Sequence, residues 1–293
     1  MTSSASRGRP DSPRVVTDSA ALSQVLRKAR TGGKVIGLVP TMGALHEGHG
    51  SLVRLAQEQC DHVGVSIFVN PAQFGPGEDL ATYPRTIDGD LSLLKDLGVA
   101  LVFTPAPESL YLPGHQTWIT VEELGSPLEG KSRPGHFRGV ATIVAKLFNA
   151  FEPDRAYFGQ KDAQQVAVIR RMARDLNFPV DIVVCPTVRE PDGLARSSRN
   201  AYLTPEEREA ATVLYRALAA ARRQYEAGER EGIALCAAMR SVIDSEPLAV
   251  AEYVSASDPD TLCETESIDP GSGVLLSMAV RIGKTRLIDN MLL

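Results

Sequence analysis

Two histidines lie three residues apart in a glycine-rich segment, and their spacing points to phosphate chemistry. The segment PTMGALHEGH spans residues 40–49, and its histidines are His46 and His49. Residues three apart project from one side of a helix start, where the free amide groups favour anions. Imidazole donors there suit a triphosphate whose charge moves onto leaving pyrophosphate. The segment therefore predicts a nucleotide-phosphate site.

Other interpretations of this segment compete with the phosphate site. A P-loop requires Lys and then Ser or Thr after Gly48, but His49 and Gly50 follow it. A zinc-protease helix requires histidines four apart. A zinc site that recruits Cys60 or His62 has no support from spacing, and a purely structural histidine pair remains an alternative.

A second polar cluster follows the apolar run at residues 62–69, in the sequence SIFVNPAQF. Asn70 and Gln73 carry amides, which donate and accept hydrogen bonds, so they suit a ligand with hydroxyls and a carboxylate. The loop RPGHFRG at residues 133–139 offers His136 or Arg138 as a weaker candidate for a carboxylate. Asn-Pro is also a common turn at a strand end, so this cluster is a weak signal alone.

A third cluster, FGQKDAQQ at residues 158–165, also follows an apolar run. Lys161 stands where a phosphate-binding lysine is expected, and Asp162 is suited to a ribose hydroxyl or to a helix cap. Gln164 and Gln165 point to different sides of the predicted helix, so we expect only one of them to face the site.

A fourth cluster places two hydroxyls and two guanidinium groups within four residues, ARSSRN at residues 195–200. Ser197, Ser198, Arg196 and Arg199 suit phosphate oxygens, and the stretch lies where a hinge between domains is expected. Side chains alternate along an extended segment, which leaves open whether Arg196 faces the site; we favour the outward orientation. The alternative for the whole stretch is a solvated polar loop.

The elements that position these clusters alternate between strands and helices. Strands are predicted at 35–39, 62–69, 100–103, 155–158 and 180–185, and helices at 20–30, 51–59, 88–97, 140–151 and 163–176. This alternation is typical of an α/β fold with a Rossmann-like open parallel sheet and helices on both faces. Ligands of such sheets bind beyond the carboxyl ends of the strands, where the first three clusters lie.

The pattern changes after about residue 188. A capping box at Thr204 begins helices predicted at 205–227 and 232–245, and strands are predicted at 249–255, 273–281 and 285–290. We expect a disordered tail at 1–14, a Rossmann-like ligand-binding domain at 15–187, and a smaller C-terminal α+β domain at 188–293 that closes over the site.

Composition excludes several classes of function. The chain has 293 residues, a net charge of −5, and 43% hydrophobic and 23% charged residues, with no long basic run. This composition does not indicate nucleic-acid binding, which requires a basic surface. No apolar run approaches the ~20 residues that span a bilayer. Four widely spaced cysteines without a CxxC pair favour free thiols in a cytoplasmic protein.

In combination, the motifs resemble those of the pantothenate synthetase family, within the wider nucleotidyltransferase group that has a His-x-Gly-His signature. The match covers residues 35–203 through PTMGALHEGH, SIFVNPAQF, YPRT, RPGHFRGV, FGQKDAQQ and SSRN, with a weaker echo at residues 283–290. The resemblance implies that ATP and pantoate form pantoyl adenylate and pyrophosphate in the domain at 15–187, and that β-alanine then attacks to give pantothenate and AMP. It also implies magnesium with ATP, and a homodimer formed through the first domain.

The resemblance assigns roles to individual residues. It implies catalytic roles for His46, His49, Lys161, Ser197, Ser198 and Arg199. It implies further ATP contacts for Met42, Gly43, Gly159, Asp162 and Val188. Pantoate would be held by Pro40, Thr41, Met42, Gln73 and Gln165, and Asp90 would help to organise magnesium.

Two residues depart from the family pattern. Gly50 follows His49 where an aliphatic residue is usual, and Arg196 stands where methionine is usual. Two other functions stay open: a nucleotidyltransferase that joins AMP to a phosphate-bearing acceptor, which shares the His-x-Gly-His logic, and a regulatory ATP-binding protein with a degraded site, which these two departures suggest. The first would not need the Gln73 and Gln165 pocket, and Lys161, Arg199 and both histidines count against the second.

Overall fold

The computed structural model describes residues 12–269 and 271–293, so most of the predicted tail at 1–14 lies outside the described residues. The strands are β1 (Arg14–Val16), β2 (Ile36–Thr41), β3 (His62–Ile67), β4 (Leu101–Phe103), β5 (Arg155–Gly159), β6 (Asp181–Cys185), β7 (Ala249–Ser257), β8 (Leu275–Ile282) and β9 (Thr285–Leu292). The longer helices are α1 (Ser19–Thr31), α2 (Glu47–Gln59), α3 (Ile87–Asp96), α6 (His136–Phe151), α7 (Ala163–Asp175), α9 (Val213–Glu226) and α10 (Gly232–Asp244). The shorter helices are η1 (Pro71–Gln73), α4 (Pro107–Leu110), α5 (Glu129–Ser132), η2 (Gln160–Asp162), η3 (Ser198–Tyr202) and α8 (Pro205–Ala210).

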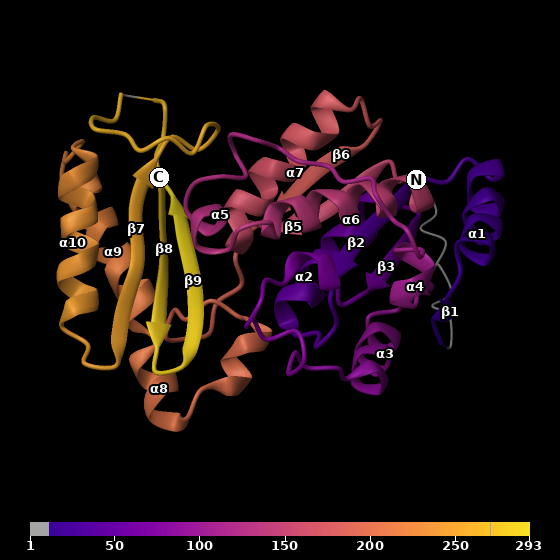
Figure 1. Cartoon of the computed structure of the whole chain (residues 1–293), viewed down its shortest axis with the longest axis horizontal. Coiled ribbons are helices and arrows are strands. Elements are labelled where there is room, and N and C mark those ends of the chain that lie inside the picture. Colours follow the sequence, from indigo (N-terminus) through magenta and orange to yellow (C-terminus); the bar gives the residue numbers. More distant parts are fainter. Residues whose placement is uncertain (1–11, 270) are drawn as a thin grey trace, which may run out of the picture.

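The larger sheet is parallel throughout and confirms the predicted fold class. Its strand order is β1-β4-β3-β2-β5-β6, so the order reverses between the neighbours β2 and β5 (Figure 1). One face packs against α1, α6 and α7, and the other packs against α2 and α3. A reversal of this kind opens a crevice at the carboxyl ends of the strands, which is where ligands of open α/β sheets bind.

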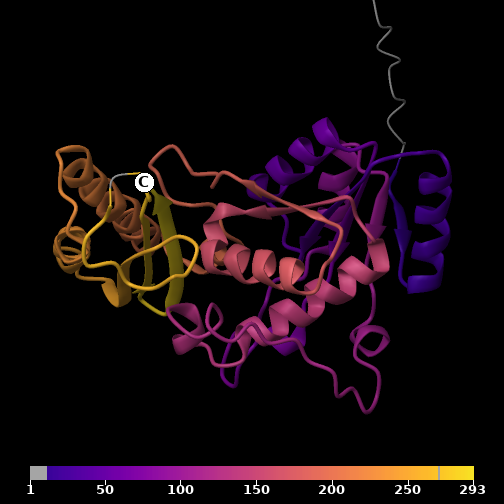
Figure 2. The ribbon, with the colours of Figure 1, turned by 90° about the horizontal axis from the view of Figure 1, so that it is seen from above.

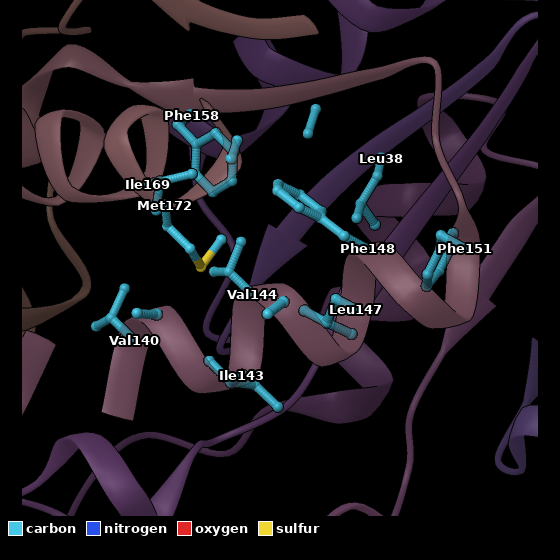
Figure 3. Packing of buried hydrophobic residues seen from close by; sticks show 14 of the residues in the cluster. Leu38, Val140, Ile143, Val144, Leu147, Phe148, Phe151, Phe158, Ile169 and Met172 are labelled. Atoms are coloured by element: carbon cyan, nitrogen blue, oxygen red, sulfur yellow. The ribbon is translucent and has the colours of Figure 1, made fainter. Parts of the chain in front are cut away.

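Helix α6 lies at the centre of the larger core. Eleven of its 16 residues are buried, and they lie around most of its circumference rather than in one stripe. Figure 3 shows Val144, Phe148 and Phe151 of α6 among residues of β2, β5 and α7. A helix that is apolar on nearly all sides is stable only when other elements surround it. Helix α6 therefore lies between α7 and the segment around η1 and holds them apart.

Several strand boundaries in the larger sheet differ from the predicted ones by one or two residues, and β3 ends at Ile67 instead of residue 69. Arg14, the last residue of the predicted tail, begins the unpredicted edge strand β1 beside β4. Strand β2 does not stop at Pro40 but continues to Thr41 along β3. On its other side, β2 pairs with β5 only at Gly37 and Leu38. Pro40 lies beyond this pairing, so its missing N–H removes no hydrogen bond to β5.

The smaller sheet is antiparallel, in the order β7-β8-β9, and forms a second core with α9 and α10. Figure 2 shows this sheet between its own two helices and the larger sheet's helices. The two strands predicted at 273–281 and 285–290 are confirmed as β8 and β9 and form a hairpin, with Gly283 in the left-handed region at φ 55°. The single helix predicted at 205–227 is two helices, because Thr212 closes a tight turn in which its hydroxyl donates to Glu209 O at 2.8 Å.

The two sheets also share contacts. Leu262 and Leu275 of the C-terminal part belong to the larger core. Arg286 of β9 makes two hydrogen bonds, of 2.7 and 2.8 Å, to the carboxylate of Glu129 in α5. The division at residues 187 and 188 stays a prediction. Within the described part of the chain, no helix is long and apolar enough to cross a membrane.

Candidate active site

A cavity of about 790 Å³ opens between the carboxyl ends of β2, β5 and β6 and the smaller sheet. A volume of this size is typical of sites for small molecules and cofactors. The structure brings nearly all predicted residues to its wall, although they are far apart in the sequence. These are Pro40, Thr41, Met42, His46, His49, Gln73, Gly159, Lys161, Asp162, Gln165, Val188, Ser197, Ser198 and Arg199. The two predicted residues that are not on this wall are Gly43 and Asp90.

The two histidines form the N-terminus of α2 and hold each other in place. His46 is the N-cap, and its Nδ1 accepts from the backbone N–H of Gly48 at 3.1 Å. His49 Nδ1 accepts from the backbone N–H of His46 at 3.3 Å. Because a neutral imidazole carries one proton, an acceptor at Nδ1 places that proton on Nε2. Each ring therefore offers one Nε2–H donor, as a phosphate site requires.

Both rings are neutral near pH 7. Burial, together with the cations of Lys161 and Arg196, lowers the pKa of His46 to about 4. Burial and the neighbouring ring of His46 lower the pKa of His49 to about 3. The ring centroids are 4.2 Å apart, and two positive charges at this distance would repel each other. The pair therefore acts through hydrogen-bond donation rather than through a fixed charge.

Asp90 holds the turn that precedes these histidines. Its carboxylate accepts from the backbone N–H groups of Ala44 at 3.0 Å and Leu45 at 2.8 Å, and from Thr86 Oγ1 at 3.0 Å. Ala44 has a φ of 49°, which a non-glycine residue adopts only at a cost, so these hydrogen bonds stabilise a strained turn.

The predicted magnesium role of Asp90 is not supported by this geometry. The side chain is buried beneath the turn, its oxygens already have three donors, and it lies off the cavity wall. The described residues also contain no group of three or more His, Cys, Asp or Glu side chains that could hold a metal ion. We therefore assign Asp90 to the support of the turn.

Lys161 projects from η2, the short helix that follows β5. Its side chain is mostly buried, at 19% exposure, and its Nζ lies 3.6 Å from Asp162 Oδ1. The Asp162 side chain is 45% exposed on the same wall, so it is available to a hydroxyl of a ligand. The backbone carbonyls of Gln160 and Lys161 accept hydrogen bonds from Asn290 of β9. The smaller sheet therefore contributes directly to the setting of this lysine.

The segment around η3 forms another part of the cavity wall, and it contacts residues that were not predicted. Arg199 makes two hydrogen bonds of 3.0 Å with the carboxylate of Asp79, and Ser198 Oγ lies 3.3 Å from Tyr83 OH. Asp79 and Tyr83 line the cavity in the loop between η1 and α3. Each lies more than 100 positions from its partner, so no local spacing in the sequence signals the contact.

The outward orientation favoured for Arg196 is wrong. Arg196 lies on the cavity wall near His46, and it is one of the cations that lower the pKa of that histidine. Its Nη2 donates to Glu190 Oε2 at 3.0 Å. Alternation along the chain leaves this orientation open, and the structure shows that Arg196 and Ser197, which caps η3, both line the cavity. The residue therefore enters the site as a guanidinium already paired with a carboxylate.

Amide groups form the part of the cavity below the histidines. Gln73 is buried and donates from Nε2 to Met42 Sδ at 3.1 Å, while its Oε1 accepts from Asn70 at 2.9 Å. Gln165 lines the cavity, whereas Gln164 is buried and bonded to backbone groups of residues 124, 127 and 129. Both glutamines have atoms on the cavity wall, but the side chain of Gln165 is more accessible to a ligand than that of Gln164.

The two weaker candidates in the loop at 133–139 differ in their relation to the cavity. His136 donates from Nδ1 to the carbonyl of Gln73 at 2.8 Å and so supports the amide pocket. Arg138 lies 5.1 Å over the ring of Trp118 and is absent from the cavity wall.

Comparisons with known proteins agree with this geometry. The sequence profile of the pantoate-beta-alanine ligase family matches residues 14–292. The chain belongs to this family. The pantothenate synthetase of Roseiflexus sp. (strain RS-1) is 61% identical over 280 residues, which cover 96% of this chain and 99% of that protein. That of Moorella thermoacetica is 55% identical over 274 residues, covering 94% and 96% of the two chains.

Solved structures of the family have the same fold. The crystal structure of pantothenate synthetase from Thermus thermophilus has a TM-score of 0.90 at 46% identity, covering 95% of this chain and 98% of that one. The ligase from Francisella tularensis, described as complexed with beta-gamma ATP and beta-alanine, has a TM-score of 0.78 at 36% identity, with coverages of 96% and 97%. Membership of the family confirms the resemblance inferred from the motifs.

Proposed function

We propose that this chain is an ATP-dependent ligase that condenses pantoate with β-alanine through a pantoyl adenylate and releases AMP and pyrophosphate. One observation carries the proposal. A single cavity contains both the side chains that can donate hydrogen bonds to phosphate and the pocket formed by glutamine amides. The family to which the chain belongs has the same named activity.

In the first step, a carboxylate oxygen of pantoate forms a bond to the α-phosphorus of ATP. The bond from that phosphorus to the bridging oxygen of pyrophosphate breaks, and its electrons remain on the leaving group. The carboxylate is already ionised at neutral pH, so the attack needs no strong base. The protein contributes position and charge stabilisation, and we assign these roles to His46, His49 and Lys161, which all line the cavity.

In the second step, the β-alanine amine attacks the acyl carbon of the adenylate, and AMP leaves with the carboxyl oxygen that had joined phosphorus. The amide pocket suits the pantoyl group, because Gln73 and Gln165 offer neutral donors and acceptors for its hydroxyls and carboxylate. Asp162 and Gly159, at the end of β5, are placed to contact the adenosine.

We propose that ATP enters as its magnesium complex, with the ion held chiefly by the phosphates. Mg²⁺ commonly keeps several waters and binds through substrate phosphates rather than a protein cage. This assignment needs no carboxylate from Asp90, which holds the histidine turn instead.

We also propose a homodimer formed through the larger domain. Leu112 and Trp118, which are 64% and 40% exposed, lie in the segment between α4 and α5 of that domain and are candidates for its interface. The cytoplasmic location stays a prediction, and the four free cysteines are typical of such a compartment. Sedimentation equilibrium of the purified chain tests the dimer, and a monomer at micromolar concentration would contradict it.

Isotope exchange tests the reaction. We expect pantoate-dependent exchange of labelled pyrophosphate into ATP without β-alanine, because adenylation is a separate step. Oxygen label in the pantoate carboxylate should appear in AMP when β-alanine is added. A preparation that forms pantothenate but shows no exchange without β-alanine would contradict the adenylate route, and one that forms no pantothenate would contradict the activity itself.

A further inference from the structure

Asn290 is a polar residue of β9 whose side chain leaves its own sheet and reaches the catalytic face of the larger one. It is buried, at 5% exposure. Its Nδ2 donates to Lys161 O at 2.7 Å and to Gln160 O at 3.0 Å. Its Oδ1 accepts from Gln160 Nε2 at 3.2 Å. All three hydrogen bonds end on η2, the short helix that carries Lys161.

Only a primary amide combines these donors and this acceptor in one short side chain. The two Nδ2–H groups serve two carbonyls, and the oxygen serves the Gln160 amide, so the hydrogen-bonding capacity of Asn290 is well used. A buried carbonyl without a donor costs about 1–3 kcal/mol, so η2 is held here by groups that are unfavourable to separate.

Asn290 is itself fixed by a second set of contacts. Its backbone N–H donates to Asp289 Oδ1 at 2.8 Å. The buried Asp289 carboxylate accepts two hydrogen bonds from Arg189, at 2.6 and 2.9 Å, and the Arg189 guanidinium lies 4.8 Å over the ring of Tyr215. These contacts join β9, the stretch after β6 and α9, so Asn290 meets η2 from a rigid support.

Resting on the proposed adenylation, we propose that Asn290 is a positioning residue that sets the backbone of η2 and thereby aims the Lys161 ammonium at the phosphates. Lys161 has a flexible four-carbon stem, and its useful position depends on where that stem begins. Misplacement of a reacting group by about 1 Å costs up to about a hundredfold in rate. Asn290 acts through Lys161 and does not touch the reacting atoms.

Pyrophosphate exchange in a double-mutant cycle tests the proposal. We expect Asn290→Ala to lower the maximal exchange rate about thirtyfold, with the KM values for ATP and pantoate within threefold of wild type. In a Lys161→Ala background the same change should lower the residual rate less than threefold, because the group it positions is gone. Asn290→Ser retains one donor, so we expect an intermediate loss; it also serves if the alanine variant does not fold.

A matched control separates positioning from the joining of the two sheets. Glu129→Gln weakens the contact with Arg286 at the same interface but leaves η2 untouched, and we expect it to lower exchange less than threefold. Equal losses from Asn290→Ala in both backgrounds, or an equal loss from Glu129→Gln, would overturn the proposal. So would wild-type exchange in both Asn290 variants. Wild-type protein without any exchange would instead refute the adenylation on which the proposal rests.

Discussion

The two walls of the cavity hold their functional groups in different ways. On the wall made by β2 and α2, neutral histidines are fixed by backbone N–H groups and by the buried Asp90 carboxylate. On the wall formed by the segment around η3, Arg196 is paired with Glu190 and Arg199 with Asp79. The first wall is held by contacts within the protein, whereas the second, in its proposed role, would exchange carboxylate partners for phosphate oxygens.

This difference teaches how one site binds a highly charged substrate without an excess of free cations. The chain carries a net charge of −5, and the guanidinium groups of the second wall are compensated locally. If ATP binds there as proposed, its binding is an exchange of ion pairs, which changes the free energy less than the burial of new charges would. Variants on each wall should therefore differ in both size and kind of effect.

The largest effect is expected on the prearranged wall. His49→Ala should lower pyrophosphate exchange at least about a hundredfold, since loss of one oriented donor commonly costs ~3 kcal/mol at the barrier. Steady-state exchange, with thermal unfolding to confirm the fold, measures it. His62→Gln, which changes a histidine at the start of β3 that is off the cavity wall, is the control. A rate for His49→Ala within threefold of wild type would remove that residue from the catalytic set.

A smaller effect on the same wall concerns pH and stability. Burial and His46 lower the pKa of His49 from 6.5 to about 3. The unfolded chain therefore takes up a proton first as the pH falls below 6.5, and stability is lost as the pH decreases. From pH 7 to pH 5 this loss is about 2 kcal/mol for His49. Urea unfolding at pH 7 and pH 5 measures the free energy of unfolding of wild type and of His49→Gln. Its decrease between the two pH values should be smaller in the variant by about this amount, and equal decreases would contradict the assignment.

On the exchanging wall, removal of a counter-ion should help the nucleotide. Asp79→Asn frees the Arg199 guanidinium, so we expect ATP to bind about fivefold more tightly, a change of ~1 kcal/mol. Asp192→Asn breaks the Arg208 pair, whose members are both off the cavity wall, and should leave ATP affinity unchanged. Calorimetric titration with a non-hydrolysable ATP analogue measures both. Weaker binding to Asp79→Asn would show that the Asp79 pair supports the closed wall rather than competing with phosphate.

The smallest effect is expected at Arg196, where the family pattern has methionine. Since Glu190 already neutralises this guanidinium, Arg196→Met should keep turnover within about threefold, a shift under ~1 kcal/mol. Turnover and pyrophosphate inhibition should be compared with those of Arg196→Met combined with Glu190→Gln, which also removes the freed carboxylate. A loss of tenfold or more in both variants would make Arg196 a phosphate ligand in its own right.

The sequence predicts the histidine pair of the first wall better than it predicts the second wall, because the contacts between the two histidines are local, whereas Asp90 reaches the same turn from a distant segment. His46, His49 and their backbone partners lie within four residues of one another, so glycines and spacing reveal the turn. The parallel sheet follows equally from its buried apolar strands. The three-residue β1 carries no periodicity, and the extension of β2 through Pro40 depends on how far β5 pairs with it.

The contacts that sequence reasoning missed all join distant segments. Asp79 and Arg199 are 120 positions apart, and Asn290 and Lys161 are 129 apart. Alternation along the chain leaves the orientation of Arg196 open, so its place on the cavity wall is evident only from the structure. Spacing along the chain carries no signal for pairs that only the docking of two sheets creates.

The contact between Asn290 and η2 also has a consequence for the order in which the protein is made. At ~5–20 residues per second, β9 leaves the synthesis machinery roughly 6–26 s after η2. The parallel sheet and both histidines are complete during that interval, but the carbonyls of Gln160 and Lys161 have not yet met Asn290. In the proposed role of Asn290, a growing chain would therefore possess the parallel sheet before it possesses an aligned lysine, and catalytic competence would arrive with a strand that lies in the other sheet.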